Sequence, residues 1–152
     1  MTRQLPDSAI EIVTRFEGCE LKSYQCPAGV WTIGYGCTGG NIVPGLVITE
    51  EVAEEWLHRD LTEVMGRVLK LIQIPLSDNE LAAILSFVYN VGIGNFQSST
   101  MYRKLLSHDY AGAADEFPRW TRAAGKVLPG LIKRRAAEKE LFLKKGEDDV
   151  RN

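Results

Sequence analysis

The chain has 152 residues, which is the size of one domain and long enough to bury a substantial core. Its hydrophobic content of 45% and charged content of 25% are ordinary for a globular protein. A net charge of -2 argues against a nucleic-acid partner, and residues 1–10 contain no apolar run that predicts a secretory signal or direct membrane insertion. We therefore expect one globular domain, made in the cytoplasm without a signal peptide.

A helix is the first predicted element, because Asp7 or Ser8 can cap it and Ser8 has Glu11 at the spacing of a capping box. Glu17 falls in the last turn of this helix. From residue 21 to residue 48, glycine, proline and β-branched residues dominate, and glycines interrupt short apolar runs. This region predicts a small, twisted antiparallel sheet.

Helices are predicted for the rest of the chain. Thr49 caps a long amphipathic helix that ends before Pro75. Ser77 and Glu80 form a second capping box, which opens a strongly apolar helix that stops at Gly92. The remaining predicted helices start at Ser98 or Ser99 and run through Leu106, extend from Tyr110 to Phe117, and extend from Leu131 to Leu143.

Residues 17–36, EGCELKSYQCPAGVWTIGYG, carry the most informative motif of the sequence. They place an acid, a thiol and a hydroxyl in a fixed order, at Glu17, Cys26 and Thr32. A turn in this glycine-rich stretch would fold Thr32 back toward Glu17. Each residue also has a structural alternative. Glu17 could be a salt-bridge partner at a helix end, Cys26 a small buried hydrophobe and Thr32 an ordinary strand residue.

This motif resembles the first block of the phage-type lysozymes, the endolysins of glycoside hydrolase family 24. Residues 85–96, LSFVYNVGIGNF, together with residues 98–100, are similar to the second block of the family. Residues 130–135 with Glu138 resemble the third block. The resemblance therefore covers nearly the whole chain.

The resemblance implies an α+β fold of the lysozyme type. It would have a small N-terminal lobe with a short antiparallel sheet, a long connecting helix and a helical C-terminal lobe. A single catalytic domain would cover residues 1–152, with lobes at about residues 1–55 and 56–146 and a tail at residues 147–152. The glycan would run through the cleft between the lobes.

The implied reaction is hydrolysis of the β-1,4 bond between N-acetylmuramic acid and N-acetylglucosamine in bacterial peptidoglycan, with no metal or organic cofactor. By motif position, Glu17 is the general acid, Cys26 occupies the site usually held by an Asp, and Thr32 matches the catalytic-site Thr of an inverting enzyme. Glycosidic cleavage commonly divides its two tasks between two carboxyl groups, and this motif offers one. A thiol is a weaker electrostatic partner than Asp, because its ordinary pKa is about 8.5.

Two alternatives to a hydrolase stay open at this point. The missing Asp is compatible with a catalytically silent module that binds peptidoglycan. A lone acid is also compatible with a lytic transglycosylase, which leaves a 1,6-anhydro product. Hydrolysis adds one water to the products of each cut, whereas transglycosylation adds none.

The resemblance also implies how the enzyme reaches its substrate. A phage holin would open the inner membrane of the bacterial host, so that the enzyme is released from the cytoplasm and acts on the periplasmic cell wall. We expect the enzyme to be a monomer whose direct partner is the peptidoglycan glycan strand.

The three cysteines, Cys19, Cys26 and Cys37, lack the CxxC spacing of a zinc site. We expect free thiols in the cytoplasm, and a bridge between Cys26 and Cys37 in an oxidising periplasm is the alternative. Cys37 also departs from the family pattern, because many relatives carry His directly after the Gly-Tyr-Gly.

Tyr35, Asn90 and Gln97 are the candidate residues for substrate binding. Asn90 and Gln97 carry amides that could bond to acetamido groups or to the peptide stem, and packing or turn formation is their structural alternative. Arg134 and Arg135 are interpreted as residues that tie the last helix to neighbouring carboxylates.

Overall fold

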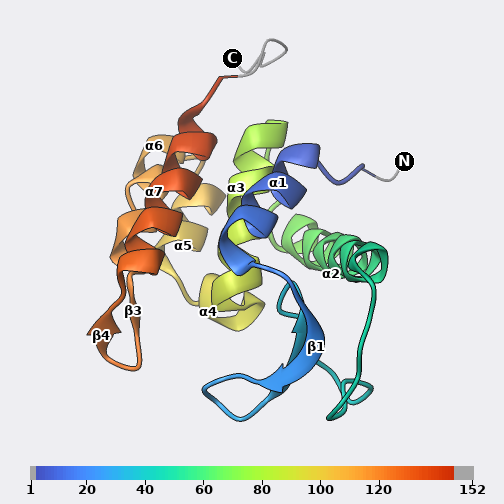
Figure 1. The fold of residues 1–152 in the computed structure, drawn as a ribbon. Coiled ribbons are helices and arrows are strands. Elements are labelled where there is room, and N and C mark those ends of the chain that lie inside the picture. Colours follow the sequence, from blue (N-terminus) through green and yellow to red (C-terminus); the bar gives the residue numbers. More distant parts are fainter. Residues whose placement is uncertain (1–2, 146–152) are drawn as a thin grey trace.

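The computed structural model describes residues 3–145, and the tail predicted at residues 147–152 lies outside the described residues. The described chain combines helices with two small antiparallel sheets, the mixed α+β composition that the sequence predicts. Its elements are α1 (Asp7–Glu17), β1 (Glu20–Gln25), β2 (Trp31–Gly34), α2 (Glu50–Leu71), α3 (Asp78–Val91), α4 (Ile93–Gln97), α5 (Thr100–Leu106), α6 (Tyr110–Ala114), the 3-10 helix η1 (Phe117–Arg119), β3 (Arg122–Ala123), β4 (Lys126–Val127) and α7 (Pro129–Leu143), as Figure 1 shows.

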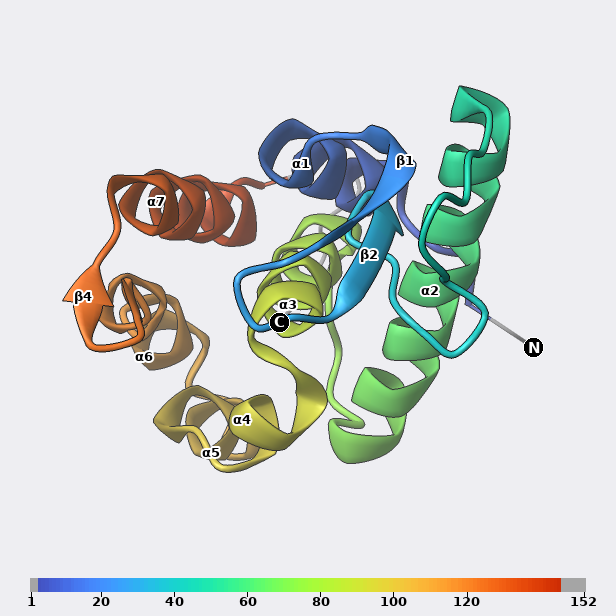
Figure 2. The same ribbon diagram turned by 60° about the horizontal axis from the view of Figure 1, so that its bottom comes forward.

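The main core lies around α3, whose residues 81–88 are all buried. α1, α2 and α7 pack against this helix, and Figures 1 and 2 show it in the middle of the helical body. Phe87 on α3 makes edge-to-face contacts with Phe117 and Trp120, with ring centroids 5.6 and 5.4 Å apart. This packing fixes the C-terminal end of α3, which carries part of the site.

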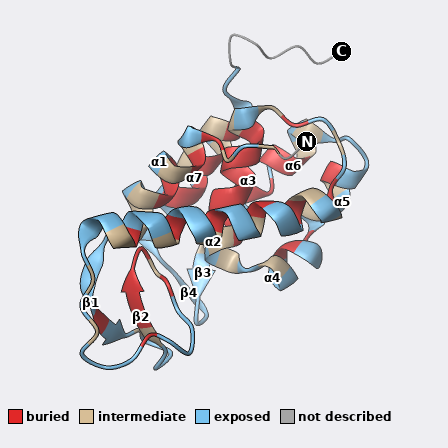
Figure 3. Ribbon diagram, turned by 90° about the vertical axis from the view of Figure 1, so that its right-hand side faces the viewer, coloured by how far each residue is buried: buried red, intermediate tan, exposed pale blue. Residues whose placement is uncertain are grey.

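The long helix α2 connects the sheet to the helical body, as predicted. Its N-cap is Thr49, whose side chain accepts a hydrogen bond from the backbone N–H of Val52 at 3.2 Å. Figure 3 shows α2 crossing from the β1–β2 sheet toward α5, with buried and exposed positions alternating along it. The buried positions recur at helical spacing, at Ala53, Leu57, Leu61, Met65 and Val68.

The predicted small sheet is the β1–β2 hairpin. The two strands are antiparallel and pair Tyr24 with Thr32 and Gln25 with Trp31. Cys26 opens the turn between them, where its N–H donates to the carbonyl of Val30 at 2.9 Å. The hairpin therefore brings the thiol and the hydroxyl of the motif to the same end of the sheet.

The predicted capping box of the first helix does not form. α1 begins at Asp7, one residue before Ser8, and its N-cap is Pro6, which makes no side-chain capping bond. Ser8 therefore lies inside the first turn, where its hydroxyl cannot act as the cap for Glu11 to complete. The end of α1 agrees with the prediction: Glu17 is its last residue and Gly18 follows with a φ of 67°.

The chain between α3 and α7 is more divided than the sequence predicts. Gly92, where the apolar helix is predicted to stop, has a φ of 93° and lies between α3 and the short helix α4. The helix predicted from Tyr110 to Phe117 ends at Ala114, and a separate 3-10 turn contains Pro118. The β3–β4 hairpin was not predicted, and α7 begins two residues before the expected Leu131.

Two expectations concern the chain as a whole. None of the helices within residues 3–145 combines the length and the apolar character that crossing a membrane requires.

The lobe boundary near residue 55 stays a prediction, since α1 packs on α3 as well as on α2.

The capping box of α3 supplies a stability test. The Ser77 hydroxyl accepts from the N–H of Glu80 at 3.0 Å, and the Glu80 carboxylate accepts from the N–H of Ser77 at 2.8 Å. Ser77→Ala should lower the free energy of unfolding by about 1 kcal/mol, the usual effect of a lost N-cap. Ser8→Ala is the matched control and should have little effect. Urea denaturation measures both, and equal effects of the two substitutions would contradict the assignment.

Candidate active site

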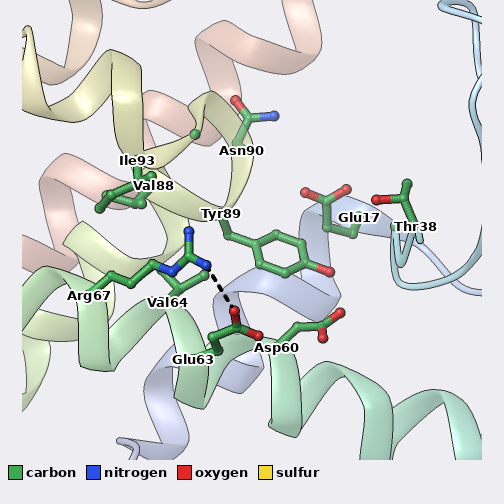
Figure 4. A pocket seen from close by; sticks show the side chains of 12 residues that line it. Glu17, Thr38, Asp60, Glu63, Val64, Arg67, Val88, Tyr89, Asn90 and Ile93 are labelled. Carbon is green, nitrogen blue, oxygen red and sulfur yellow. Dashed lines mark hydrogen bonds and ion pairs between the residues drawn. The ribbon is translucent and has the colours of Figure 1, made fainter. Parts of the chain in front are cut away.

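Glu17 stands at the edge of a cavity of about 450 Å³. The cavity lies between the end of α1, the loop after β2, the middle of α2 and the C-terminal end of α3. The Glu17 side chain is 20% exposed, so it can meet a ligand while its backbone is held by the helix. Figure 4 shows its carboxylate directed toward the space above the Tyr89 ring.

The loop after β2 approaches Glu17 closely because residue 36 is glycine. Gly36 has a φ of 87°, and a Cβ at this position would lie 3.3 Å from Oε1 of Glu17. The nearby Tyr89 hydroxyl donates to the carbonyl of Tyr35 at 2.5 Å and so ties this loop to α3. The second glycine of the Gly-Tyr-Gly motif thus lets the loop and the acid share one small space.

Arg134 on α7 fixes the carboxylate of Glu17. Its Nη1 donates to Oε2 of Glu17 at 2.6 Å, although the two residues are 117 positions apart in the sequence. The Arg134 side chain is 4% exposed, and it also donates to Glu138 at 3.2 Å and to the carbonyl of Ser86 at 3.0 Å. A guanidinium held by three partners is a rigid support for the acid.

Glu138 completes this buried network. Its side chain is fully buried and accepts hydrogen bonds from Ser86 at 2.6 Å, from Arg134 and from Arg135. Burial lowers the pKa of Arg135, and the charge of Glu138 opposes that effect. Arg134 ties the last helix to a neighbouring carboxylate, that of Glu17, as predicted. The prediction is wrong for Arg135, whose carboxylate partner Glu138 lies on the same helix and whose contacts with other segments are the carbonyl of Trp120 and the side chain of Asn90.

Cys26 and Thr32 lie together in the hairpin, outside the set of residues that line the Glu17 cavity. Thr32 is buried, and its hydroxyl donates to the carbonyl of Val30 at 2.9 Å. The pKa of the Cys26 thiol is lowered, first by hydrogen bonding to the backbone of Val30 and then to that of Ala28, with a smaller contribution from the Thr32 side chain. The turn thus makes the Cys26 thiol easier to deprotonate than an ordinary thiol.

The candidate binding residues lie in different surroundings. Asn90 lines the cavity with Glu17, and its side-chain oxygen accepts a hydrogen bond from Arg135. Tyr35 is largely buried in an apolar cluster, and Gln97 is exposed at the end of α4. Asn90 is therefore the candidate that the fold brings to the acid, and the roles of all three stay predictions.

The sequence did not predict that one face of α2 lines the Glu17 cavity, where it forms what we call the α2 wall. Asp60, Glu63, Val64 and Arg67 line the cavity from one face of this helix. Their spacing of three, four and seven residues was a detectable signal, because such positions share a helix face. Charged residues at this spacing are equally typical of a solvated face, so the sequence alone could not assign them to the cavity.

Cys37 contacts this wall from the loop after β2. It is 2% exposed, and its thiol donates to Oδ2 of Asp60 at 3.1 Å. Burial, reinforced by the hydrogen bond and the negative charge of Asp60, raises the pKa of the Cys37 thiol to about 12. The thiol thus stays protonated near neutral pH. Cys19 and Cys26 are also free thiols in the structure.

The described residues offer little to a metal ion. No group of three or more His, Cys, Asp and Glu side chains in residues 3–145 is arranged to hold one. What the site presents instead is a partly exposed carboxyl group on a rigid support, beside a cavity of a size that accommodates small organic ligands.

Comparison with known proteins identifies the family. The model of the family described as phage lysozyme matches residues 14–138. The chain belongs to the phage lysozyme family. An endolysin from Acyrthosiphon pisum secondary endosymbiont phage 1 is 46% identical over 142 residues, which cover 91% of this chain and 97% of the relative. A SAR-endolysin from Bacteriophage PS34 is 42% identical over 127 residues, covering 84% of this chain and 76% of the relative.

Solved phage lysozymes and related structures share the fold. A mutant of P22 lysozyme superimposes with a TM-score of 0.83 and 36% identity, covering 94% of this chain and all of the other chain. The fold is thus lysozyme-like, as the resemblance implied. The chain spans 55% of the length of the endolysin of Bacillus phage PZA, with which it is 40% identical over 141 residues.

These relationships confirm the family and the class of activity expected from the sequence. The protein is a phage-type lysozyme, a glycoside hydrolase that degrades peptidoglycan. The silent binding module and the lytic transglycosylase are not favoured.

The buried Cys37 thiol predicts a loss of stability in alkaline solution. An unfolded thiol loses its proton near its ordinary pKa of about 8.5. The folded Cys37 thiol has a pKa raised to about 12 by burial and the contact with Asp60. Between these values the folded state binds more protons, so the free energy of unfolding should fall by about 1.4 kcal/mol per pH unit.

Urea denaturation between about pH 8 and pH 11 measures this slope. Cys37→Ala should lack the contribution, and the exposed Cys19→Ala, the matched control, should retain it. Equal slopes in wild type and Cys37→Ala would show that the thiol does not titrate in this way.

Proposed function

We propose that this lysozyme hydrolyses the β-1,4 bond between N-acetylmuramic acid and N-acetylglucosamine with Glu17 as the general acid. The observation that carries the proposal is the position of this carboxyl group, partly exposed at a cavity and held by the buried Arg134. A positioned acid of this kind is what protonation of a glycosidic oxygen requires.

The proposed reaction begins when Glu17 transfers its proton to the bridging oxygen. The bond from this oxygen to the anomeric carbon breaks, and positive charge develops on the sugar that retains that carbon. A water molecule attacks the anomeric carbon from the opposite face and gives up a proton. Each cut therefore consumes one water, and solvent restores the proton of Glu17.

We assign the attacking water to Cys26 and Thr32. The backbone hydrogen bonds of the hairpin turn lower the pKa of the Cys26 thiol, so a thiolate can accept the proton of the water. Its negative charge also stabilises the positive charge on the sugar, the task that an Asp performs in the usual pattern. Thr32, whose side chain contributes to the thiol's environment, would orient the water.

We further propose that the enzyme acts as a monomer on the wall of a bacterial host and that a phage holin gives it access. Similarity to phage endolysins supports the cell wall as the place of action. Relatives named SAR-endolysins indicate that the route of export differs within the family. Membership of the family therefore leaves the route open, and the holin is our proposal for this chain.

Removal of the acid is the direct test of the mechanism. Glu17→Gln keeps the size of the side chain and should lower the rate of clearing of outer-membrane-stripped bacteria by about 10²- to 10⁴-fold. Glu20→Gln, an exposed acid on β1, is the matched control and should retain full activity. Mass analysis of the wild-type fragments should show one added water per cut. Wild-type clearing by Glu17→Gln would remove this residue from the mechanism.

Substitution of Cys26 tests its role. Cys26→Asp supplies the carboxylate of the usual pattern, which is ionised near neutral pH because the ordinary pKa of Asp is about 3.9, so this variant should remain active. Cys26→Ser keeps the size of the side chain but removes the group that can accept the proton of the water, so it should lower activity by about 10²-fold. Clearing of outer-membrane-stripped bacteria measures both variants, and full activity of Cys26→Ser would limit the thiol to packing.

A further inference from the structure

The α2 wall of the cavity extends well beyond the catalytic acid. From Asp60 to Arg67 it spans seven residues, which is about 10 Å along the helix axis. Figure 4 shows Arg67 and Glu17 on opposite sides of the Tyr89 ring. The cavity can therefore receive a part of the substrate that is remote from the bond being cut.

Charge is distributed unevenly around this cavity. Three of its lining residues are carboxylates, Glu17, Asp60 and Glu63, and Arg67 is the basic residue among the lining set. Glu17 is engaged by Arg134, and Asp60 accepts from the Cys37 thiol and from Arg59. Arg67 thus supplies the positive charge at the far end of the cavity.

The contacts of Arg67 leave it able to change partner. Its Nη2 donates to Oε1 of Glu63 at 3.1 Å, one turn earlier on the same helix. The two side chains are 60% and 61% exposed, and ion pairs between exposed side chains on one helix are weak. The guanidinium carries five N–H donors, so a second carboxylate could bind it beside Glu63 or in its place.

Substrate chemistry indicates what this guanidinium meets, provided that the proposed function is correct. The hydroxyl and acetamido groups of the glycan are neutral. The carboxylates of peptidoglycan are carried by the short peptides attached to its muramic acid residues. A planar guanidinium matches a carboxylate with two parallel hydrogen bonds, which a lysine cannot do.

We propose that Arg67 binds a carboxylate in the remote part of the peptide stem carried by the muramic acid at the bond being cut, and that this contact makes the enzyme prefer wall material with anionic stems. Val64, Val88 and Ile93 form the apolar surface beside it. Glu63 competes with the stem for Arg67 and so limits the affinity. Arg67 is a specificity residue in this proposal and takes no part in the chemical step.

Binding measurements separate this contact from catalysis. The protein is the full chain carrying Glu17→Gln, and the probes are soluble, uncrosslinked glycan strands with native stems or with stem carboxylates converted to amides. Calorimetry should show that amidation weakens binding about fivefold, the effect of one partly exposed charge-assisted contact. Adding Arg67→Gln should weaken binding of native strands about fivefold and abolish the response to amidation.

Two further variants sharpen the test. Arg103→Gln removes an exposed arginine of α5 that lies outside the cavity, and it should respond to amidation like the Glu17→Gln parent. Glu63→Gln should strengthen binding of native strands, but not when Arg67→Gln is also present. Thermal unfolding of each variant checks that the fold is retained.

The outcomes distinguish this proposal from the proposed function. An equal response to amidation with and without Arg67→Gln would overturn the role of Arg67, as would equal weakening by Arg67→Gln of native and amidated strands. Degradation of the strands by the Glu17→Gln protein at the wild-type rate, seen by mass analysis, would instead count against Glu17 as the acid.

Discussion

The candidate active site depends on one buried carboxylate, that of Glu138. It binds the guanidinium groups of Arg134 and Arg135 and the hydroxyl of Ser86, and so joins α7 to the central helix α3. A buried charge that loses its partner costs several kcal/mol, so this network strongly opposes rearrangement. Because Arg134 also binds Glu17, the same constraint that assembles the helices holds the acid at the end of α1.

The two halves of the proposed mechanism rest on different kinds of structure. Glu17 lies on a helix and is supported by side chains from α7, far away in the sequence. Cys26 and Thr32 lie on a short two-stranded hairpin, and the pKa of the thiol is lowered mainly by backbone groups of its own turn. A two-stranded hairpin is marginal in isolation, so its position depends on apolar contacts such as those of Ile33 and Ile42.

Local signals in the sequence predicted much of this fold correctly. Thr49 and Ser77 mark helix starts because their capping bonds span three residues and need no distant partner. The same reasoning was wrong for Ser8, since the helix already begins at Asp7 after Pro6. The short α4 and the β3–β4 hairpin were missed because they are brief and lack a clear hydrophobic period.

By itself, the sequence determined the family and the α+β fold and singled out Glu17 as the candidate acid, since these follow from motifs and periodic patterns along the chain. Tertiary structure alone decided that Arg134 supports this acid and that Asp60 and Arg67 face the same cavity. It also decided that Cys37 meets Asp60 as a protonated thiol. The physical reason is that a charged residue on a helix looks the same in sequence whether its face meets water or a cavity. Only the packing of distant segments makes that choice.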